Sequence, residues 1–382
     1  MSGKRATPTA PTVDRALQLA QQGMSGAEID RILGIAAPEK SVEVTKIPRD
    51  VLAEIARDVF GAATRITDAQ RLGPVTRHGL ARRGGFTGNL IYKLTLSTEA
   101  SPIVVRFNRG LRQDVFVQEQ QNYADVRAAT GVRGPDVLHV DRSLRLAPTE
   151  FMVMEHITGE LAGFLTHPDN PEVTDAQKAD IHRDTGQFFA DLHRARKPQS
   201  DGRAEERQVL FGIYRLQEVA ARHADLVDPA LVAEVIAALQ NSPSLQCADP
   251  ALCFMDADLL FQPEGDGWRL AHVCDLEWVC YRSPNVDLAS QLCPQGALWA
   301  LETAGIEGAA LDQVRRNPFF ATYGAHHSID WHRLLENLVH YQLSLWGHAI
   351  ADQPTPEAQT YLLGQRGDLI RNLMLRICAT AT

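Results

Sequence analysis

The sequence has little cysteine and no paired cysteine motif. Six cysteines occur in 382 residues, and no two of them are separated by only two residues. This excludes the closely spaced Cys-x-x-Cys pairs of zinc modules and thioredoxin-like redox sites. Single thiols within apolar runs behave as small hydrophobic side chains and are typical of proteins from reducing compartments. We therefore expect a cytoplasmic location.

Long apolar runs and an excess of positive charge are also absent. No stretch approaches the ~20 apolar residues that span a bilayer, and residues 1–11 lack the apolar core of a signal peptide. The net charge is −9, from 38 basic and 47 acidic residues. This balance argues against a general nucleic-acid or anionic-membrane binder. We expect neither nucleic acid nor membrane among the partners, and the sequence does not indicate an oligomeric state.

The composition is typical of a soluble enzyme, and the length of the chain predicts two or three packing units. Apolar residues make up 45% of the chain and charged residues 22%. Residues 1–12 are predicted to be disordered, and residues 13–35 carry helical spacing on either side of a glycine-containing break. The latter segment favours a small helical cap, with a DNA-binding helix-turn-helix as the alternative that the net charge disfavours. A further helix is predicted from Pro48 to Phe60.

Two acidic pairs flank a predicted strand–turn–strand segment. The first pair is Asp256 with Asp258, and the second is Asp275 with Glu277; the predicted turn is Pro263–Gly267. Paired strands would bring these carboxylates to one end of a hairpin. Crowded carboxylates repel one another unless a cation lies between them, and Mg²⁺ takes oxygen ligands. The segment predicts a magnesium site, and a solvated acidic turn is the alternative.

A glycine-rich turn and one basic strand residue come earlier in the chain. Residues 84–89 lead into a predicted strand at 90–96, and such a turn lets backbone amides approach a phosphate, although ordinary hairpins also use it. Arg106 lies in the middle of an apolar strand, so it must be paired or contact a ligand, unless an edge position lets it reach water. Glu119 lies near the apolar face of the helix predicted at 114–130. We expect Glu119 to pair with Arg106.

The order of the predicted elements indicates an α+β protein with two lobes. Strands at 136–140 and 150–155 follow the two earlier strands and the helix at 114–130, after which helical patterns dominate. We predict an N-terminal helical extension (residues 1–45), a small N-lobe with an antiparallel sheet (46–157) and a larger, mostly helical C-lobe (158–382). The later predicted helices are Trp299–Thr303, Ser328–Gln353 and Pro356–Ile377.

Seven loose motifs occur in the order found in one known family. In chain order they are Gly84–Asn89, Val104–Phe107 with Glu119, Gly131–Leu138, Phe151–Gly159, Phe189–Ala195, Cys274–Trp278 and Asn285–Ala289. With these motifs, the sequence from about Gly84 to Leu288 resembles the aminoglycoside phosphotransferase and choline kinase family, relatives of the protein kinases. The resemblance implies a two-lobed protein-kinase-like fold. It also implies a kinase that transfers a phosphoryl group to an alcohol, with ATP and Mg²⁺ as cofactors.

The resemblance further implies roles for individual residues. The nucleotide would be bound by the phosphate-covering loop, the strand and helix pair and the hinge, which means Gly85, Phe86, Thr87, Asn89, Arg106, Glu119, Glu155 and Ile157. Asp275 would hold Mg²⁺, and Glu277 would be a neighbour of the ion or a further ligand. His193 would be structural. Asp287 would cap a helix and brace the catalytic loop.

One departure from the family pattern affects the catalytic loop. The family has His-Gly-Asp, four further residues and then Asn, whereas this chain has Phe254 and Met255 before Asp256. If the next strand begins soon after Asp258, the loop is three residues shorter and Asp258 takes the place of the metal-binding Asn. Without that gap, Phe261 falls at the Asn position. We favour the shorter loop, with Asp256 as the catalytic residue that orients the acceptor hydroxyl and Asp258 as a metal ligand.

These patterns predict an ATP-dependent phosphotransferase that acts on a hydroxyl of a small molecule, such as an antibiotic or metabolite. GTP is not excluded as the donor. A kinase of peptide or protein Ser/Thr and a catalytically degenerate nucleotide-binding protein are the alternatives. Several C-terminal histidines suggest a zinc site, but no compelling ligand spacing supports one. The candidates for the acceptor pocket are His326, His327, Asp330 and Glu336.

Overall fold

The computed structural model describes most of the central part of the chain. The described residues are 46–72, 76–77, 80–81, 90–108, 115–167, 170–196, 228–240, 249–254, 258–277, 279–292, 309–338 and 371–372, together with Leu19 and Leu375. Several expectations therefore lie outside the described residues. They concern the N-terminal helices at 13–35, the glycine-rich loop, Asp256, the helix Trp299–Thr303 and nearly all of the chain after residue 338.

The chain divides into two compact units. One, here called the sheet unit, contains residues 37–185 and 256–279, and the other, the helical unit, contains residues 1–36, 186–255 and 280–382. The domain boundaries predicted after residues 45 and 157 stay a prediction.

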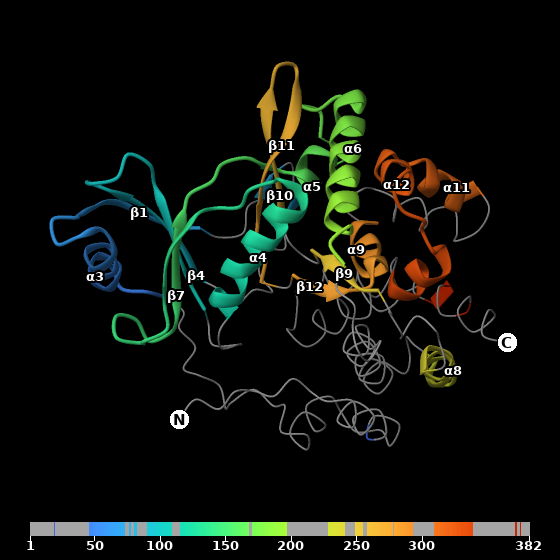
Figure 1. Cartoon of the computed structure of the whole chain (residues 1–382), viewed down its shortest axis with the longest axis horizontal. Coiled ribbons are helices and arrows are strands. Elements are labelled where there is room, and N and C mark those ends of the chain that lie inside the picture. The colour runs from blue at the N-terminus through green and yellow to red at the C-terminus, as the bar shows by residue number, and fades with distance from the viewer. Residues whose placement is uncertain are drawn as a thin grey trace. The chain divides into compact units, whose positions relative to one another are not determined.

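The sheet unit combines an antiparallel sheet with helices and a separate hairpin (Figure 1). Its elements in chain order are α3 (Arg49–Phe60), β1 (Ile66–Leu72), β2 (Thr76–Arg77), β3 (Leu80–Ala81), β4 (Leu90–Leu96), β5 (Ile103–Phe107), α4 (Val115–Thr130), β6 (Val137–Asp141), β7 (Phe151–Glu155), β8 (Glu160–Leu161), α5 (Ala162–Leu165), the first part of α6 (Asp175–Leu192), β10 (Asp258–Glu264) and β11 (Gly267–Cys274). Five of the strands form one antiparallel sheet in the order β1-β4-β5-β7-β6.

Strand β5 is buried along its whole length because helices lie on both faces of the sheet (Figure 1). Val105 and Phe107 join a core cluster with residues of α3, whereas Val104 packs in a second cluster with Phe116 of α4. Side chains alternate between the two faces along a strand. Arg106 therefore lies on the α4 side, two positions from Val104.

The predicted helix boundaries are close to those observed. Pro48 precedes α3 as its N-cap rather than starting the helix, and α4 ends where Gly131 adopts a φ of +75°, with its amide donating to the carbonyl of Arg127 at 2.8 Å. This is the αL geometry for which glycine has no Cβ penalty. Strand β1 was not predicted: every residue in it is at least partly exposed, so the sequence has no clear apolar alternation there.

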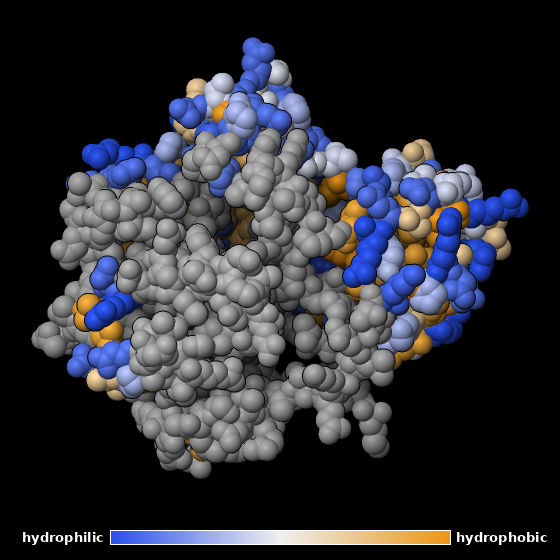
Figure 2. Space-filling model, turned by 180° about the vertical axis from the view of Figure 1, so that it is seen from behind, coloured by the Kyte–Doolittle hydropathy of each residue, from blue (hydrophilic) through white to orange (hydrophobic). Residues whose placement is uncertain are grey.

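Strands β10 and β11 form the predicted hairpin, but its turn is tighter than expected. Strand β10 continues past Pro263 to Glu264, and β11 begins at Gly267. Pro263 pairs with Trp268, and the turn lies at Gly265 and Asp266. Proline is tolerated there because β8 pairs only with Leu260 and Phe261, which leaves that side of β10 open. Hydrophilic side chains cover the end of this hairpin, at the top of Figure 2.

The helical unit is built around buried aromatic side chains. Its described elements are the end of α6, α8 (Pro229–Gln240), β9 (Ala251–Cys253), β12 (Cys280–Arg282), α9 (Pro284–Gln291), α11 (Ala309–Arg316), α12 (Pro318–Gly324) and a helical stretch at 331–338. Phe188, Phe189, Phe254 and Phe319 form edge-to-face pairs in its core. Elements β12, α11 and α12 were not predicted from the sequence. Within the described residues, no helix has the length and apolar character needed to cross a membrane.

Candidate functional site

Arg106 is the centre of a buried ionic cluster in the sheet unit. It is 3% exposed, and its guanidinium lies 5.6 Å from the centre of the Phe116 ring. Nη1 donates to both carboxylate oxygens of Glu119, at 2.8 and 3.0 Å. A buried guanidinium needs such partners because an unpaired buried charge is costly. The predicted contact between Arg106 and Glu119 is confirmed, and Arg106 is not the snorkelling edge-strand residue of the alternative interpretation.

Glu119 is fully buried on α4 and is held from more than one side. Besides Arg106, its Oε1 accepts from the Tyr123 hydroxyl at 2.9 Å and from the Leu276 amide at 3.3 Å. Burial raises the pKa of the Tyr123 hydroxyl, so this side chain stays a donor. The role of Tyr123 was missed in the sequence. Its position four residues after Glu119, on the same helix face, was the available signal.

Asp275 and Glu277 lie directly after β11 and contact the other amino group of Arg106. Nη2 donates to Oδ1 of Asp275 at 2.7 Å and to Oε2 of Glu277 at 3.0 Å. Asp275 has a φ of +65°, which is uncommon for a residue other than glycine. Such strained conformations cluster at functional sites. The segment is held from α4 as well, because the Asn122 side chain donates to the carbonyl oxygens of Leu276 and Val279 at 2.7 and 3.3 Å.

The cluster contains one guanidinium and three carboxylates. Burial lowers the pKa of Arg106, but the charges of Glu119, Asp275 and Glu277 raise it above its ordinary value, so the guanidinium stays charged. Burial raises the pKa of Glu119 to about 7, against the lowering effect of the Arg106 charge. The cluster carries more negative than positive charge when its carboxylates are ionised. It can therefore accommodate a further cation beside Asp275, whose side chain is 24% exposed.

The structure places the other predicted metal ligand at the same end of the hairpin. Asp258 is the first residue of β10 and pairs with Cys274, the residue before Asp275. This is the arrangement of acidic residues that the two predicted strands implied. Asp256 lies outside the described residues, as do the four predicted loop residues Gly85, Phe86, Thr87 and Asn89.

The predicted hinge follows β7. Glu155 is the last residue of that strand and pairs with Ile103 of β5, and its side chain contacts Arg133 and accepts from the Asp136 amide at 3.3 Å. Ile157 lies two residues later in the connection to β8 and is partly buried. The Arg133–Glu155 pair was not anticipated. It holds the end of β7 to the segment between α4 and β6.

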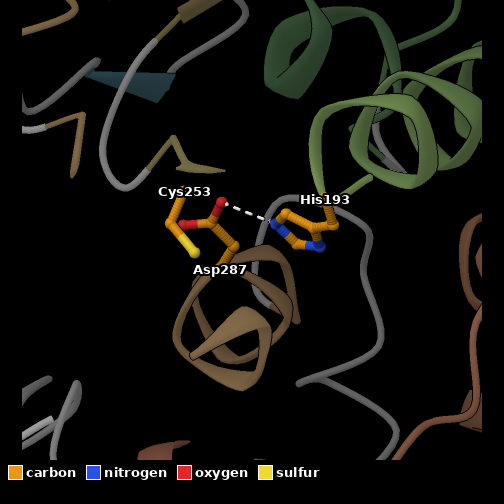
Figure 3. A group of neighbouring side chains, drawn as sticks. All are labelled: His193, Cys253 and Asp287. Carbon is orange, nitrogen blue, oxygen red and sulfur yellow. Dashed lines mark hydrogen bonds and ion pairs between the residues drawn. The ribbon is translucent and has the colours of Figure 1, made fainter. Parts of the chain in front are cut away.

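A second buried cluster lies in the helical unit and joins His193, Asp287 and Tyr323. Nε2 of His193 lies 3.1 Å from Oδ2 of Asp287, and Nδ1 lies 2.9 Å from the Tyr323 hydroxyl. His193 and Asp287 point toward one another, with Cys253 beside Asp287 (Figure 3). Oδ2 of Asp287 also accepts from the Phe254 amide at 2.5 Å. This contact fixes the backbone two residues before Asp256. Asp287 is not the predicted helix cap, because Ser283 is the N-cap of α9 and accepts from the Asn285 amide. Bracing of the catalytic loop stays a prediction, since residues 255–257 lie outside the described residues.

This second cluster, together with Cys253, also contains the types of residue that bind metal ions. The possible ligand atoms of His193, Cys253 and Asp287 lie within 4.8 Å of one another. However, both ring nitrogens of the histidine have partners, and the Cys253 thiol donates to the carbonyl oxygens of Arg282 and Ser283 at 3.5 and 3.4 Å. The hydrogen bonds favour a structural brace for the backbone before Asp256.

A match to a known protein family spans both clusters. The model of the phosphotransferase enzyme family matches residues 81–334, more than half of the 382 residues. The chain belongs to this family. The resemblance inferred from the seven motifs is thereby confirmed. No curated protein sequence matches the chain significantly.

Solved structures share the fold of this family member at low sequence identity. A candidate aminoglycoside phosphotransferase from Ralstonia eutropha is 16% identical with a TM-score of 0.58, over 88% of this chain and 99% of that chain. The GDP and kanamycin complex of APH(2")-IIia is 15% identical with a TM-score of 0.52, over 80% and 94%. A microcompartment-associated aminopropanol kinase is 14% identical with a TM-score of 0.52, over 87% and 98%. These likenesses confirm the predicted α+β, protein-kinase-like fold class.

The departure from the family's catalytic loop has a packing explanation. Phe254, which stands where the family has His, is 1% exposed and packs edge-to-face on Phe188 and Phe189, with ring centroids 5.0 and 5.9 Å apart. The position has become part of the core. Phe261, the alternative for the Asn position, is fully buried within β10. A buried phenylalanine cannot bind a metal. The shorter loop, with Asp258 as a ligand, stays a prediction.

The candidate acceptor residues are only partly brought together. His327 and Asp330 line one cavity of about 220 Å³ in the helical unit, together with Arg196, Pro284, Asn285, Leu288, Tyr323 and Ser328. Nε2 of His327 lies 2.8 Å from the carbonyl oxygen of Ala190. His326 contacts Gln187 at an exposed position, and Glu336 contacts His332. Neither His326 nor Glu336 is among the residues that line this cavity.

Proposed function

We propose that this family member transfers the γ-phosphoryl group of ATP to a hydroxyl of a small molecule. The observation that carries the proposal is the Arg106 cluster, in which a buried guanidinium links Glu119 of α4 to Asp275 and Glu277 after β11. Phosphoryl transfer depends chiefly on positioning and charge neutralisation. A rigid cation next to acidic metal ligands provides both.

The residues present fit a nucleotide with Mg²⁺. Carboxylates are the hard oxygen donors that Mg²⁺ prefers, and Asp275 and Asp258 would hold the ion. The Nε–H of Arg106 is buried without an acceptor among the described residues, so the guanidinium retains one donor for an anion. When bound, the ion would neutralise phosphate charge. Arg106 would orient the α/β-phosphates, and Glu155 and Ile157 would place the base.

Asp256 would orient the acceptor hydroxyl and accept its proton. Asp287 supports this role because it fixes the Phe254 amide two residues earlier in the chain. The related solved structures include an antibiotic complex and an amino-alcohol kinase. We therefore propose an acceptor that carries a hydroxyl and an amine, with amino sugars and amino alcohols as the first compounds to assay. GTP is the alternative donor.

A nucleotide-binding protein without turnover is the second candidate. It is favoured by Phe254, because the catalytic loop has lost the family's polar residue at that position to the hydrophobic core. Both candidates require nucleotide binding, and only the first requires transfer. A transfer assay therefore separates them, whereas a binding assay does not.

The deciding experiment compares Asp256→Asn with Asp258→Asn. We expect Asp256→Asn to bind ATP with Mg²⁺ normally and to lose turnover by roughly 10²–10⁴-fold, the usual contribution of a positioned acid or base. Asp258→Asn should weaken the Mg²⁺ dependence of binding. Phosphate transfer is followed by ³¹P NMR with the acceptor panel, and binding by thermal shift. If Asp258→Asn alone abolishes turnover with binding intact, the loop assignment is wrong. Binding without transfer to any acceptor would favour the second candidate.

A further inference from the structure

Two cysteines face each other across the short sheet of the helical unit. Strand β12 pairs antiparallel with β9, and the register sets Cys280 directly opposite Cys253 with no shift along the ladder. Opposed residues of an antiparallel pair have Cα atoms about 4.5–5.5 Å apart and side chains on the same face. A disulfide needs a Cα separation of about 4.4–6.8 Å. The strand pairing therefore satisfies the backbone requirement for a bond between these two residues.

The two thiols differ in their surroundings. Cys280 is exposed, and its sulfur receives the Nε–H of Arg282 at 3.0 Å and a second donor from the same guanidinium. The Arg282 guanidinium is charged at every relevant pH, so the Cys280 sulfur lies against a permanent positive charge. The thiolate is the form of a cysteine that attacks oxidants. Cys253 is buried, and its thiol lies against the carbonyl oxygens of Arg282 and Ser283, at the end of the partner strand.

We propose that Cys280 and Cys253 form a peroxide-sensitive thiol pair that is oxidised to a disulfide. The thiolate of Cys280 attacks one oxygen of hydrogen peroxide, the O–O bond breaks, and a sulfenic acid and hydroxide result. The hydroxide takes up a proton and leaves as water. The Cys253 thiol then loses its proton and attacks the sulfenic sulfur; the S–S bond forms, the S–O bond breaks and a second water leaves. The two sulfurs lose two electrons, which the peroxide accepts.

The positions of the two residues along the chain connect this bond to the proposed active site. Cys253 precedes Asp256 by three residues, and Cys280 follows Glu277 by three. To form the bond, the Cys253 sulfur must leave the carbonyl oxygens of Arg282 and Ser283 and turn toward Cys280. The side-chain contact that holds the end of β9 to Arg282 and Ser283, just before the catalytic loop, is then lost. We expect turnover to fall by about tenfold or more, because small misplacements of a catalytic group are costly. This effect rests on the proposed function, whereas formation of the disulfide does not.

Mass spectrometry of the peroxide-treated, full-length chain tests the proposal without an activity assay. Trypsin cleaves after Arg222, Arg269 and Arg282, so the bond joins peptides 223–269 and 270–282. Each peptide holds one other cysteine, and Cys247→Ser and Cys274→Ser show which pair is linked. We expect the linked peptides in the wild type, with a mass lower by two hydrogens. They should persist in Cys247→Ser and Cys274→Ser and disappear in Cys280→Ser.

Cys280→Ser is the informative variant because the side chain is exposed and outside the proposed catalytic machinery. Its turnover should equal that of the wild type before treatment and should survive peroxide, whereas Cys378→Ser, the matched control, should be inactivated like the wild type. Dithiothreitol should restore wild-type activity. Absence of the 253–280 link after treatment would overturn the proposal, and so would a link that survives in Cys280→Ser. Equal peroxide sensitivity of Cys280→Ser and wild type would overturn the regulatory role alone.

Discussion

Arg106 and Asp275 are 169 positions apart in the sequence and are joined by a hydrogen bond of 2.7 Å from Nη2 to Oδ1. The same guanidinium holds Glu119 through its other amino group. One side chain of β5 therefore connects α4 with the segment that follows β11. Ion pairs between charged groups have short, directional hydrogen bonds, which fix the relative positions of their partners. Asp275, one of the proposed metal ligands, is thus positioned before any ion binds.

Replacement of Arg106 by Met should destabilise the chain strongly. The change leaves three carboxylates without their cation, and breaking a buried pair in this way costs about 3–5 kcal/mol. Urea denaturation measures the free energy of unfolding. The double variant Arg106→Met/Glu119→Gln should recover part of the loss, because the most deeply buried carboxylate is removed as well. A loss below about 1 kcal/mol for the single variant would show that the cluster is not a buried pair.

The variant Asp275→Asn should remove Mg²⁺-dependent nucleotide binding and preserve the fold. Asn is enriched at positive φ and keeps an oxygen that can accept from Arg106, so the +65° backbone persists while the charge is lost. A bound ligand raises the melting temperature by mass action. We expect ATP with Mg²⁺ to raise the melting temperature of the wild type and to leave that of this variant unchanged. Addition of EDTA should likewise abolish the increase in the wild type. Asp266→Asn, in the exposed hairpin turn, is the matched control. An unchanged shift in Asp275→Asn would count against the site.

Contacts that a local sequence pattern indicates were predicted, whereas contacts that arise only when distant segments pack together were not. Arg106 and Glu119 could be paired because an Arg in an apolar strand and a Glu on an apolar helix face each need a partner. The hairpin followed from the two apolar runs, although its turn was predicted to begin at Pro263, which instead pairs with Trp268. No local pattern indicated that Asn122 holds the carbonyl of Leu276, since this contact joins residues 154 positions apart.

Elements with weak periodicity were also missed. Helix α12 begins at an Asn317 N-cap, whose side chain accepts from the Phe319 amide, and has only seven residues. Such a short helix shows less than two turns of apolar spacing, so its existence depends on the packing of Phe319 and Phe320 in the core. A structural role for His193 was inferred from the family resemblance, whereas the Tyr323 hydroxyl that contacts this histidine comes from α12 and was not anticipated.

Asp287→Asn should lower kcat more than it changes KM. Oδ2 of Asp287 accepts from the Phe254 amide and lies beside His193, so the amide variant can present a donor where an acceptor is required. We expect kcat to fall by roughly tenfold or more, because small misplacements of a catalytic group are costly. Tyr323→Phe removes only the contact on the far side of His193 and should have a smaller effect. A variant that is less stable but keeps its kcat would indicate a structural role alone.

The contribution of His272 to the stability of the chain should decrease as the pH falls through the range just below 6.5, whereas the raised pKa of Glu119 acts in the opposite direction. Burial lowers the pKa of His272 below its ordinary value of 6.5, and the charge of Arg133 lowers it further. Between the lowered pKa and 6.5 the unfolded chain binds more protons than the folded chain, so this contribution to stability is present above that range and is lost as the pH falls. His272→Gln should remove this contribution, so stability should fall less, or rise more, as the pH is lowered than in the wild type, as measured by urea denaturation from pH 5 to 8. If the free energy of unfolding of the variant depends on pH as that of the wild type does, the pH dependence comes from other groups. His156 and His327, whose pKa values are also lowered, are examples.

Two glycine-to-alanine variants should have opposite effects. A Cβ at Gly186, in α6, would lie 2.5 Å from the carbonyl oxygen of Phe319, and this backbone atom cannot move aside as a flexible side chain could. Overpacking of this kind costs about 1–3 kcal/mol. A Cβ at Gly163, in α5, would have no neighbouring atom within 4 Å. Gly163→Ala should therefore be neutral or stabilise by up to about 1 kcal/mol through the lower entropy of the unfolded chain. Thermal unfolding of both variants checks the pair, and equal melting temperatures would show that α6 does not pack closely against the start of α12.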